Sequence, residues 1–120
     1  MERTDRISSE MQKTVSGIIR DDLKDPRIPL MLSVVGATVT KDLKYAKIYV
    51  SILGDDEVKK EAMKALKSSN GYIRRQVAAK MNLRIVPELN FILDESIERG
   101  AHISSLIDAA IKEDEEKSNG

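Results

Sequence analysis

The stretch KSSNGYIRRQVAAKM, residues 67–81, interrupts a pattern that otherwise has the spacing of one long helix. Apolar residues recur at helical spacing before the interruption, and they recur again after it at Ile73, Val77 and Met81. Asn70 and Gly71 stand between the two patterns, and both residue types tolerate positive or irregular φ angles. The sequence therefore predicts two short helices separated by a break, at which Gly71 can take a positive or irregular φ angle.

Length and composition favour one compact unit. The chain has 120 residues, the usual size of a single domain. With no cysteine and one histidine, it lacks disulfides, thiol nucleophiles and nearly every zinc site built from Cys and His. It has no signal-like start and no uninterrupted apolar run of about 18 residues. We expect a soluble cytoplasmic protein without metal, cofactor or membrane contact.

The formal net charge of zero conceals an uneven distribution. Residues 94–120 contain three basic and eight acidic residues, so this segment carries −5 and the rest of the chain +5. Charges are screened within about 10 Å at ordinary salt, so the two parts act separately. The basic body is compatible with a nucleic-acid partner despite the neutral total.

An amphipathic helix is predicted over residues 3–25, where the motif DPRIP stops it. Opposite its apolar face runs a stripe of basic residues, namely Arg3, Arg6, Lys13, Arg20 and Lys24. The stripe is either a solvated helix face or part of a binding surface.

Two strands should follow and form a hairpin. Residues 30–40 carry apolar side chains on both faces, which is typical of a strand well inside a sheet. Residues 45–53 alternate, with Ala46, Ile48, Val50 and Ile52 on one face and Tyr45, Lys47, Tyr49 and Ser51 on the other.

The second half of the chain should be helix, kink, helix and strand. A helix begins after Gly54, since aspartates suit a first turn. Its expected buried side is Val58, Ala62, Ala65 and Leu66, and its other side is Lys60, Lys64 and Lys67. A strand is expected over 82–93, with Leu89, Phe91 and Leu93 on one face and Pro87 at an edge or bulge. A final helix and an acidic disordered tail complete the chain.

Four motifs in this order carry a resemblance to a known family: DPRIP, DLKYAKIYVSI, NGYIRRQ and LRIVPELNFILDESIERG. Together they resemble the bacterial ribosome-binding factor A family over residues 3–107. The resemblance implies an α+β fold, a type II KH-like domain with a mixed three-stranded sheet and helices on one face. On this basis 1–94 would be the RNA-binding domain and 95–120 a C-terminal helix and tail. The family replaces the KH GxxG loop by a kink, typically Ala-x-Gly, which here matches Ser69, Asn70 and Gly71.

The resemblance also implies a function. Members bind the free or immature small ribosomal subunit, aid maturation of the 5′ end of its ribosomal RNA, support growth in the cold, and are displaced by an assembly GTPase. We therefore expect a monomeric, non-catalytic assembly factor. The rival hypotheses are a protein-interaction adaptor on the same scaffold and, less favoured, a small-molecule enzyme.

The expected RNA-binding surface combines three groups of basic residues. A fresh helix N-terminus after the kink attracts phosphate, and Arg74 and Arg75 lie beside it. The full set is Arg3, Arg6, Lys13, Arg20, Lys24, Lys60, Lys64, Lys67, Arg74 and Arg75. The alternative is that Gly71 is only a helix C-cap and that the two arginines only solubilise the surface.

Other candidates are weaker. His102 has no second His or Cys with which to share a metal. Asp94 and Glu95 resemble an acid pair but lie where a strand meets a helix, which favours capping. Tyr45 and Tyr49 could stack bases, although outward strand tyrosines more often cover neighbouring side chains.

Overall fold

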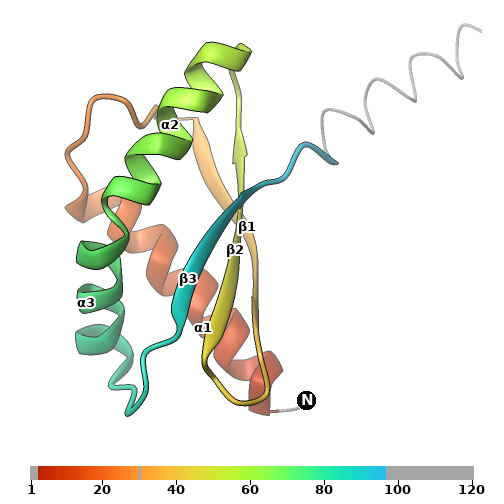
Figure 1. Ribbon diagram of the computed structural model, residues 1–120, viewed down its shortest axis with the longest axis vertical. Coiled ribbons are helices and arrows are strands. Elements are labelled where there is room, and N and C mark those ends of the chain that lie inside the picture. The colour runs from red at the N-terminus through yellow and green to blue at the C-terminus, as the bar shows by residue number, and fades with distance from the viewer. Residues whose placement is uncertain (1–2, 30, 97–120) are drawn as a thin grey trace, which may run out of the picture.

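Three helices cover one face of a three-stranded sheet in the computed structural model, which describes residues 3–29 and 31–96 (Figure 1). The elements in chain order are α1 (Arg3–Gly17), the π-helical turn η1 (Ile18–Asp22), β1 (Leu32–Val39), β2 (Tyr45–Ile52), α2 (Asp56–Ser68), α3 (Asn70–Met81) and β3 (Glu88–Leu93). The expected α+β fold with helices on one face is confirmed. The expected C-terminal helix and tail lie outside the described residues.

The sheet is mixed, with the strand order β1-β2-β3. β1 and β2 form the predicted antiparallel hairpin, and β3 runs parallel to β2. The predicted alternation of β2 is confirmed, because Ala46, Ile48, Val50 and Ile52 are all buried.

The prediction that residues 30–40 form an interior strand is wrong, since β1 lies at an edge of the sheet. The register shifts between Val34 and Gly36, so that Val35 is an extra residue. Val35 is 38% exposed. The apolar residues on both faces of β1 therefore reflect this bulge, and helices do not cover both faces.

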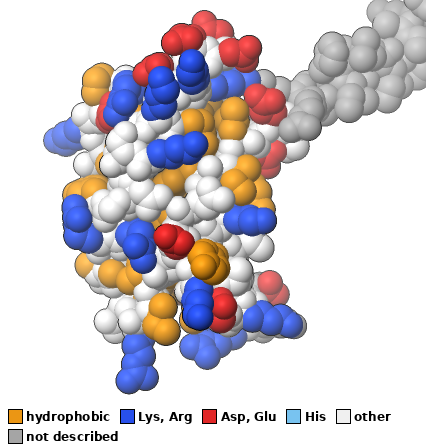
Figure 2. Space-filling model, in the orientation of Figure 1, with side chains coloured by type: hydrophobic (Ala, Val, Ile, Leu, Met, Phe, Trp, Pro, Cys, Tyr) orange, Lys and Arg blue, Asp and Glu red, His pale blue; other side chains and the backbone are white. Residues whose placement is uncertain are grey.

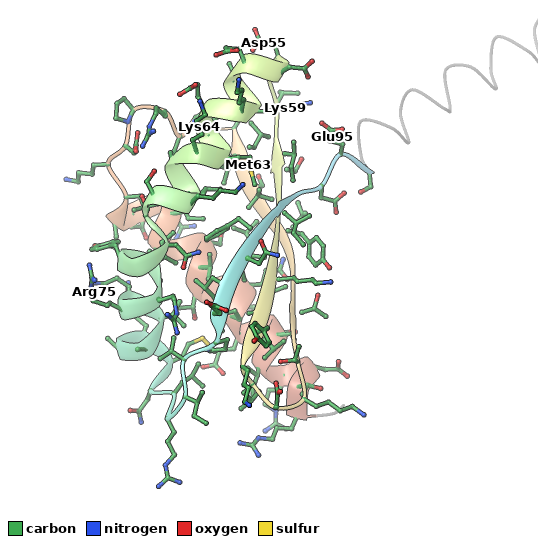
Figure 3. All side chains as sticks on the ribbon, in the orientation of Figure 1. Asp55, Lys59, Met63, Lys64, Arg75 and Glu95 are labelled. Carbon is green, nitrogen blue, oxygen red and sulfur yellow. The ribbon has the colours of Figure 1, made fainter. Side chains whose placement is uncertain are left out.

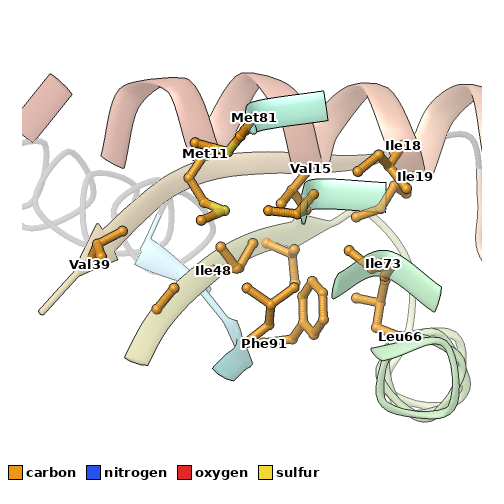
Figure 4. Packing of buried hydrophobic residues seen from close by; sticks show 14 of the residues in the cluster. Met11, Val15, Ile18, Ile19, Val39, Ile48, Leu66, Ile73, Met81 and Phe91 are labelled. Carbon is orange, nitrogen blue, oxygen red and sulfur yellow. The ribbon is translucent and has the colours of Figure 1, made fainter. Parts of the chain in front are cut away.

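The core lies between the sheet and the helices (Figure 4). Met11, Val15 and Ile18 of the first helix meet Ile73 and Val77 of α3 above the inward residues of β2 and β3. Of the inward residues predicted for β3, Leu89 and Phe91 are buried and Leu93 is partly buried against the core. This packing sets α1 and α3 side by side in one helical layer.

The first helix ends differently from the prediction. Leu23 N–H donates to Ile18 O at 3.1 Å, an i to i−5 bond that widens the last turn into a π-helix. Leu23 is already extended, so Lys24 lies beyond the helix and not on its stripe. Because a π turn holds more residues than an α turn, Arg20 also departs from the 3.6-residue spacing on which the stripe was predicted.

The start of α2 follows the prediction. Asp55 caps the helix, because its Oδ1 accepts a hydrogen bond of 2.9 Å from Val58 N–H. Gly54 has a φ of +157°, and a Cβ there would lie 3.0 Å from Val58 Cγ1. This position therefore requires a glycine.

The predicted buried side of α2 needs one correction. Val58 is 38% exposed, and Lys59 takes its place at 7% exposed, beside Ala62 and Leu66. Lys59 Nζ lies 3.6 Å from Glu95 Oε1, so this lysine joins α2 to the chain leaving β3.

Helix side chains occupy the outer backbone edges of both outer strands. On β1, Ser8 Oγ accepts from Val39 N–H at 3.1 Å and Gln12 Nε2 donates to Val34 O at 3.4 Å. On the β3 side, Asn70 Nδ2 donates to Leu89 O at 2.8 Å. Edges occupied in this way are less available for pairing with another strand. No described helix is long and apolar enough to span a membrane.

Candidate nucleic-acid interface

The break between α2 and α3 is a single residue, Ser69, with φ −90° and ψ 2°. Its N–H donates to Ala65 O at 3.0 Å, and its carbonyl accepts from Ile73 N–H at 2.9 Å. These two hydrogen bonds join Ser69 to the last turn of α2 and to the first turn of α3. The chain changes direction there without a loop.

Asn70 and Gly71 belong to the first turn of α3. The expectation that Gly71 has an irregular or positive φ is wrong, because Gly71 is helical and Gly54 is the glycine with positive φ among the described residues. The irregular angles fall on Ser69, in a region that a residue with a side chain can adopt. The hydrogen bond from Asn70 to the edge strand β3 fixes the direction in which α3 leaves the break.

The two arginines after the break have different environments. Arg74 is half-buried, and its guanidinium donates from Nε to Pro87 O at 3.1 Å and from Nη2 to Val86 O at 3.0 Å. Arg75 is exposed on the outer side of α3 (Figure 3). Arg74 thus holds the buried Pro87 and the entry to β3, whereas Arg75 is available to a ligand.

The N-terminus of α3 has features that suit an anion. It has no acidic residue in its first turn and no side-chain cap. A Cβ placed on Gly71 would lie 3.9 Å from Nη1 of Arg75, so this guanidinium lies over the first turn. A helix N-terminus with an adjacent arginine attracts phosphate.

The lysines of α2 lie on its outer side, as predicted. Lys60, Lys64 and Lys67 are exposed, and Lys67 lies in the last turn, next to the break. Lys64 Nζ is 3.5 Å from Glu61 Oε1, an exposed pair that a stronger ligand can replace. Acidic side chains gather where α2 begins, and basic side chains follow the outer margin of α2 and α3 (Figure 2).

The basic stripe of the first helix is only partly regular. Arg3, Arg6 and Lys13 are exposed on α1, as predicted. Arg20 is exposed too, but its Nε and Nη2 donate to Asp21 at 3.1 and 3.2 Å. This pairing raises the pKa of Arg20, first through the hydrogen bond and then through the charge of Asp21. Arg20 is therefore a weaker candidate than the other arginines of this helix.

A second arginine near the first helix is held by a carboxylate. Asp25 accepts from the backbone N–H of Arg27 at 2.9 Å and from its Nη2 at 2.7 Å. The side-chain hydrogen bond, followed by the backbone one, lowers the pKa of Asp25 to about 2. The DPRIP motif thus forms a closed turn after η1.

The structure brings the predicted basic residues into one helical layer, on two neighbouring parts of it. α1 packs against α3, and Lys80 Nζ of α3 lies 3.2 Å from Asp22 Oδ2 of η1. One part is the outer side of α1, and the other is the outer side of α2 with the break, where Lys60, Lys64, Lys67 and Arg75 lie. Lys24 and Arg74 belong to neither.

The acid pair and the histidine that the sequence analysis considered as weaker candidates gain no support from the described structure. Asp94 Oδ1 accepts from Ser96 N–H at 2.8 Å, a local contact, and Glu95 pairs with Lys59. His102 lies outside the described residues. Within the described part of the chain, no group of three or more His, Cys, Asp or Glu side chains could hold a metal ion.

Lys59 was missed in the sequence, although a signal for it exists. It is spaced three and seven residues before Ala62 and Leu66, so it lies on the apolar side of α2. A lysine on a buried stripe predicts an acidic partner nearby, which here is Glu95.

Comparisons with known proteins agree on one family. The family model of Ribosome-binding factor A matches residues 3–107. Ribosome-binding factor A of Clostridium tetani is 53% identical over 117 residues, which cover 98% of this chain and 96% of that protein.

One solved structure and one homology model fitted into a cryo-EM map share the fold. The solution structure of a putative ribosome-binding factor A from Thermotoga maritima matches with a TM-score of 0.68 and 32% identity, covering 75% of this chain and 85% of that one. A homology model of the Thermus thermophilus ribosome-binding factor A, fitted into the cryo-EM map of its 30S complex, matches with a TM-score of 0.62 and 22% identity, covering 73% of this chain and 91% of that one. The latter likeness shows the fold alone, which is the KH-like fold of these structures. The chain belongs to the ribosome-binding factor A family.

Proposed function

We propose that this chain is an assembly factor that binds the free or immature small ribosomal subunit through its ribosomal RNA. The observation that carries the proposal is the α2–α3 break, where an uncapped helix N-terminus lies beside the exposed Lys67 and Arg75. Phosphate groups of an RNA backbone suit this arrangement. Family membership supports the proposal, as does the Thermus thermophilus relative, which was fitted into a map of its 30S complex.

The RNA-binding set that we propose follows from the geometry. The break and Lys60, Lys64, Lys67 and Arg75 form its centre, and Arg3, Arg6 and Lys13 extend it over α1. Arg20 contributes only if RNA phosphate displaces Asp21. Arg74 acts indirectly, by holding the chain that leads into β3.

The finer parts of the function rest on the family. We propose that the protein works by binding, without catalysis, as a cytoplasmic monomer that aids maturation of the 5′ end of the ribosomal RNA and growth in the cold. An assembly GTPase would displace it. We further propose that residues 1–94 form the RNA-binding domain and that residues 95–120 form a C-terminal helix and an acidic disordered tail.

Sucrose-gradient sedimentation of the tagged protein tests this function. We expect it to migrate with free small subunits, and not with large subunits. In cells that lack the protein, primer extension should reveal unprocessed 5′ ends of the small-subunit RNA. Migration only as free protein would contradict the proposal and favour the protein-interaction adaptor.

A further inference from the structure

The sheet face opposite the helices is a second chemically distinct surface. No described element packs on it, and the helices lie on the other side (Figure 1). The outward residues of β2 are Tyr45, Lys47, Tyr49 and Ser51. This face is separate from the helical layer on which the proposed RNA-binding set lies.

Two tyrosine rings and a lysine stem line a groove on this face. The groove has a volume of about 210 Å³ and is lined by Thr38, Val39, Thr40, Tyr45, Lys47 and Tyr49. Outward residues of a strand are spaced about 6.6 Å apart, so Lys47 separates the two rings. Pockets that hold drug-sized ligands have volumes of about 300–1,000 Å³. The groove is smaller, and therefore suits one planar group.

The two tyrosines have different roles. Tyr49 packs over Gly36 of β1, where a Cβ would lie 3.6 Å from its Cδ2. It thus covers a neighbour, as outward strand tyrosines often do. Tyr45 is 56% exposed at the end of β2 and leaves much of its ring to solvent. An exposed aromatic ring can stack on any nucleobase.

The charges around Tyr45 favour a polyanion. Lys41, Lys44 and Lys47 are all exposed on the hairpin and β2. The nearby carboxylates are those of Asp42 and Glu88. Asp42 is engaged within the turn, accepting from Thr40 Oγ1 at 2.7 Å and from Lys44 N–H at 3.0 Å.

We propose that this groove is a second RNA site, in which a base of single-stranded RNA stacks on Tyr45 while Lys47 contacts an adjacent phosphate. The inference rests on the proposed function, because it adds a second contact to the same RNA partner. Glu88 pairs in register with Tyr45 from the β3 side. The phosphate therefore lies toward β1 and the hairpin lysines, away from Glu88.

Fluorescence anisotropy with the full chain and a labelled single-stranded RNA of about eight nucleotides tests the site. Tyr45→Leu keeps an apolar side chain and removes the ring, so it should weaken binding about 5- to 150-fold, the loss measured for one stacked base. Tyr45→Phe keeps the ring and should bind like the unaltered protein. An abasic oligomer of the same length should bind Tyr45→Leu and the unaltered protein equally.

The variant Glu88→Gln provides an independent test of the proposed site. It removes a negative charge beside Tyr45 and should tighten RNA binding, whereas a basic protein partner on this face would bind less tightly to the variant. Equal RNA binding by Tyr45→Leu and the unaltered protein, no binding by the unaltered protein, or weaker RNA binding by Glu88→Gln would each overturn the inference. Migration of the unaltered protein with small subunits tests the proposed function separately, so either proposal can fail while the other stands.

Discussion

Replacing Arg74 by glutamine should destabilise the fold, whereas the same change at Arg75 should not. Arg74 makes two hydrogen bonds to the carbonyls of Val86 and Pro87. A hydrogen bond from a charged donor contributes about 1.5–3 kcal/mol, and the half-buried position lets water replace part of the loss. We expect Arg74→Gln to cost about 1–2 kcal/mol in total.

Thermal unfolding measures this cost. For a domain of this size each kcal/mol lowers Tm by about 4–8 °C, so Arg74→Gln should lower Tm by about 4–16 °C. Arg75→Gln changes an exposed side chain and should stay within about 0.5 kcal/mol of the unaltered protein. The two variants remove the same charge at adjacent positions, so their difference isolates the contact with the β3 entry.

Hydrogen exchange locates the effect. In Arg74→Gln the amides of the chain leading into β3 should exchange faster, because the carbonyls that Arg74 held are free to move. If Arg74→Gln melts like the unaltered protein, or if Arg75→Gln loses as much stability, then Arg74 does not hold this segment and our separation of the two arginines is wrong.

Three further outcomes are expected. Gly71→Ala should raise the free energy of unfolding by about 0.5–1 kcal/mol in a denaturant titration, because the position is helical and has room for a Cβ. A lower free energy of unfolding would show that the position needs glycine. Gly54→Ala should cost about 1–3 kcal/mol in the same assay, because of its positive φ and the 3.0 Å approach to Val58; an unchanged midpoint would refute this. Asp25 has a pKa of about 2 in the folded protein, against 3.8 for the isolated group, so its pairing with Arg27 should stabilise the protein above pH 3.8, and this stabilisation should be lost as the pH falls toward 2. Asp25→Asn should remove this part of the pH dependence of stability. Titration of the Asp25 carboxyl near pH 3.8 by NMR would contradict the prediction.

Local sequence patterns predicted much of this fold. The alternation of β2 has a period of two, which only a strand with one buried face satisfies, and Asp55 carries the signal of an N-cap. The order of the elements and the place of the break followed from the same kind of pattern. These features depend on interactions between residues close together in the chain, so they can be predicted from the local sequence.

Two features that the pattern of apolar residues does not record were mispredicted. In the π turn at Ile18–Asp22, the N–H of Leu23 donates to Ile18 O and not to Ile19 O as in an α turn, and this leaves no mark on the spacing of apolar residues. The extra residue Val35 at the bulge gives the sequence of β1 the pattern of a strand with apolar residues on both faces.

The candidate site was predicted less completely than the fold. In the sequence, Arg74 and Arg75 were equal candidates for binding phosphate because both are arginines that follow the break. Their roles differ only in the structure, where the carbonyls of Val86 and Pro87 accept hydrogen bonds from Arg74. Exposure of Lys67 followed from helical spacing. The role assigned to Gly71 was wrong because a helix can change direction at a serine in the bridge region of φ/ψ space.

The salt dependence of binding to purified small subunits tests the central claim most directly. Lys67→Gln combined with Arg75→Gln should weaken binding at moderate salt and reduce the slope of log K against log salt by roughly one unit for each lost phosphate contact, with Tm nearly unchanged. Replacing Lys112 and Lys117 by glutamine removes the same charge from the acidic C-terminal segment and should leave both the affinity and the slope unchanged. An equal loss in the two double variants, or an unchanged slope in the first, would contradict the assignment of the α2–α3 break as the RNA-binding surface.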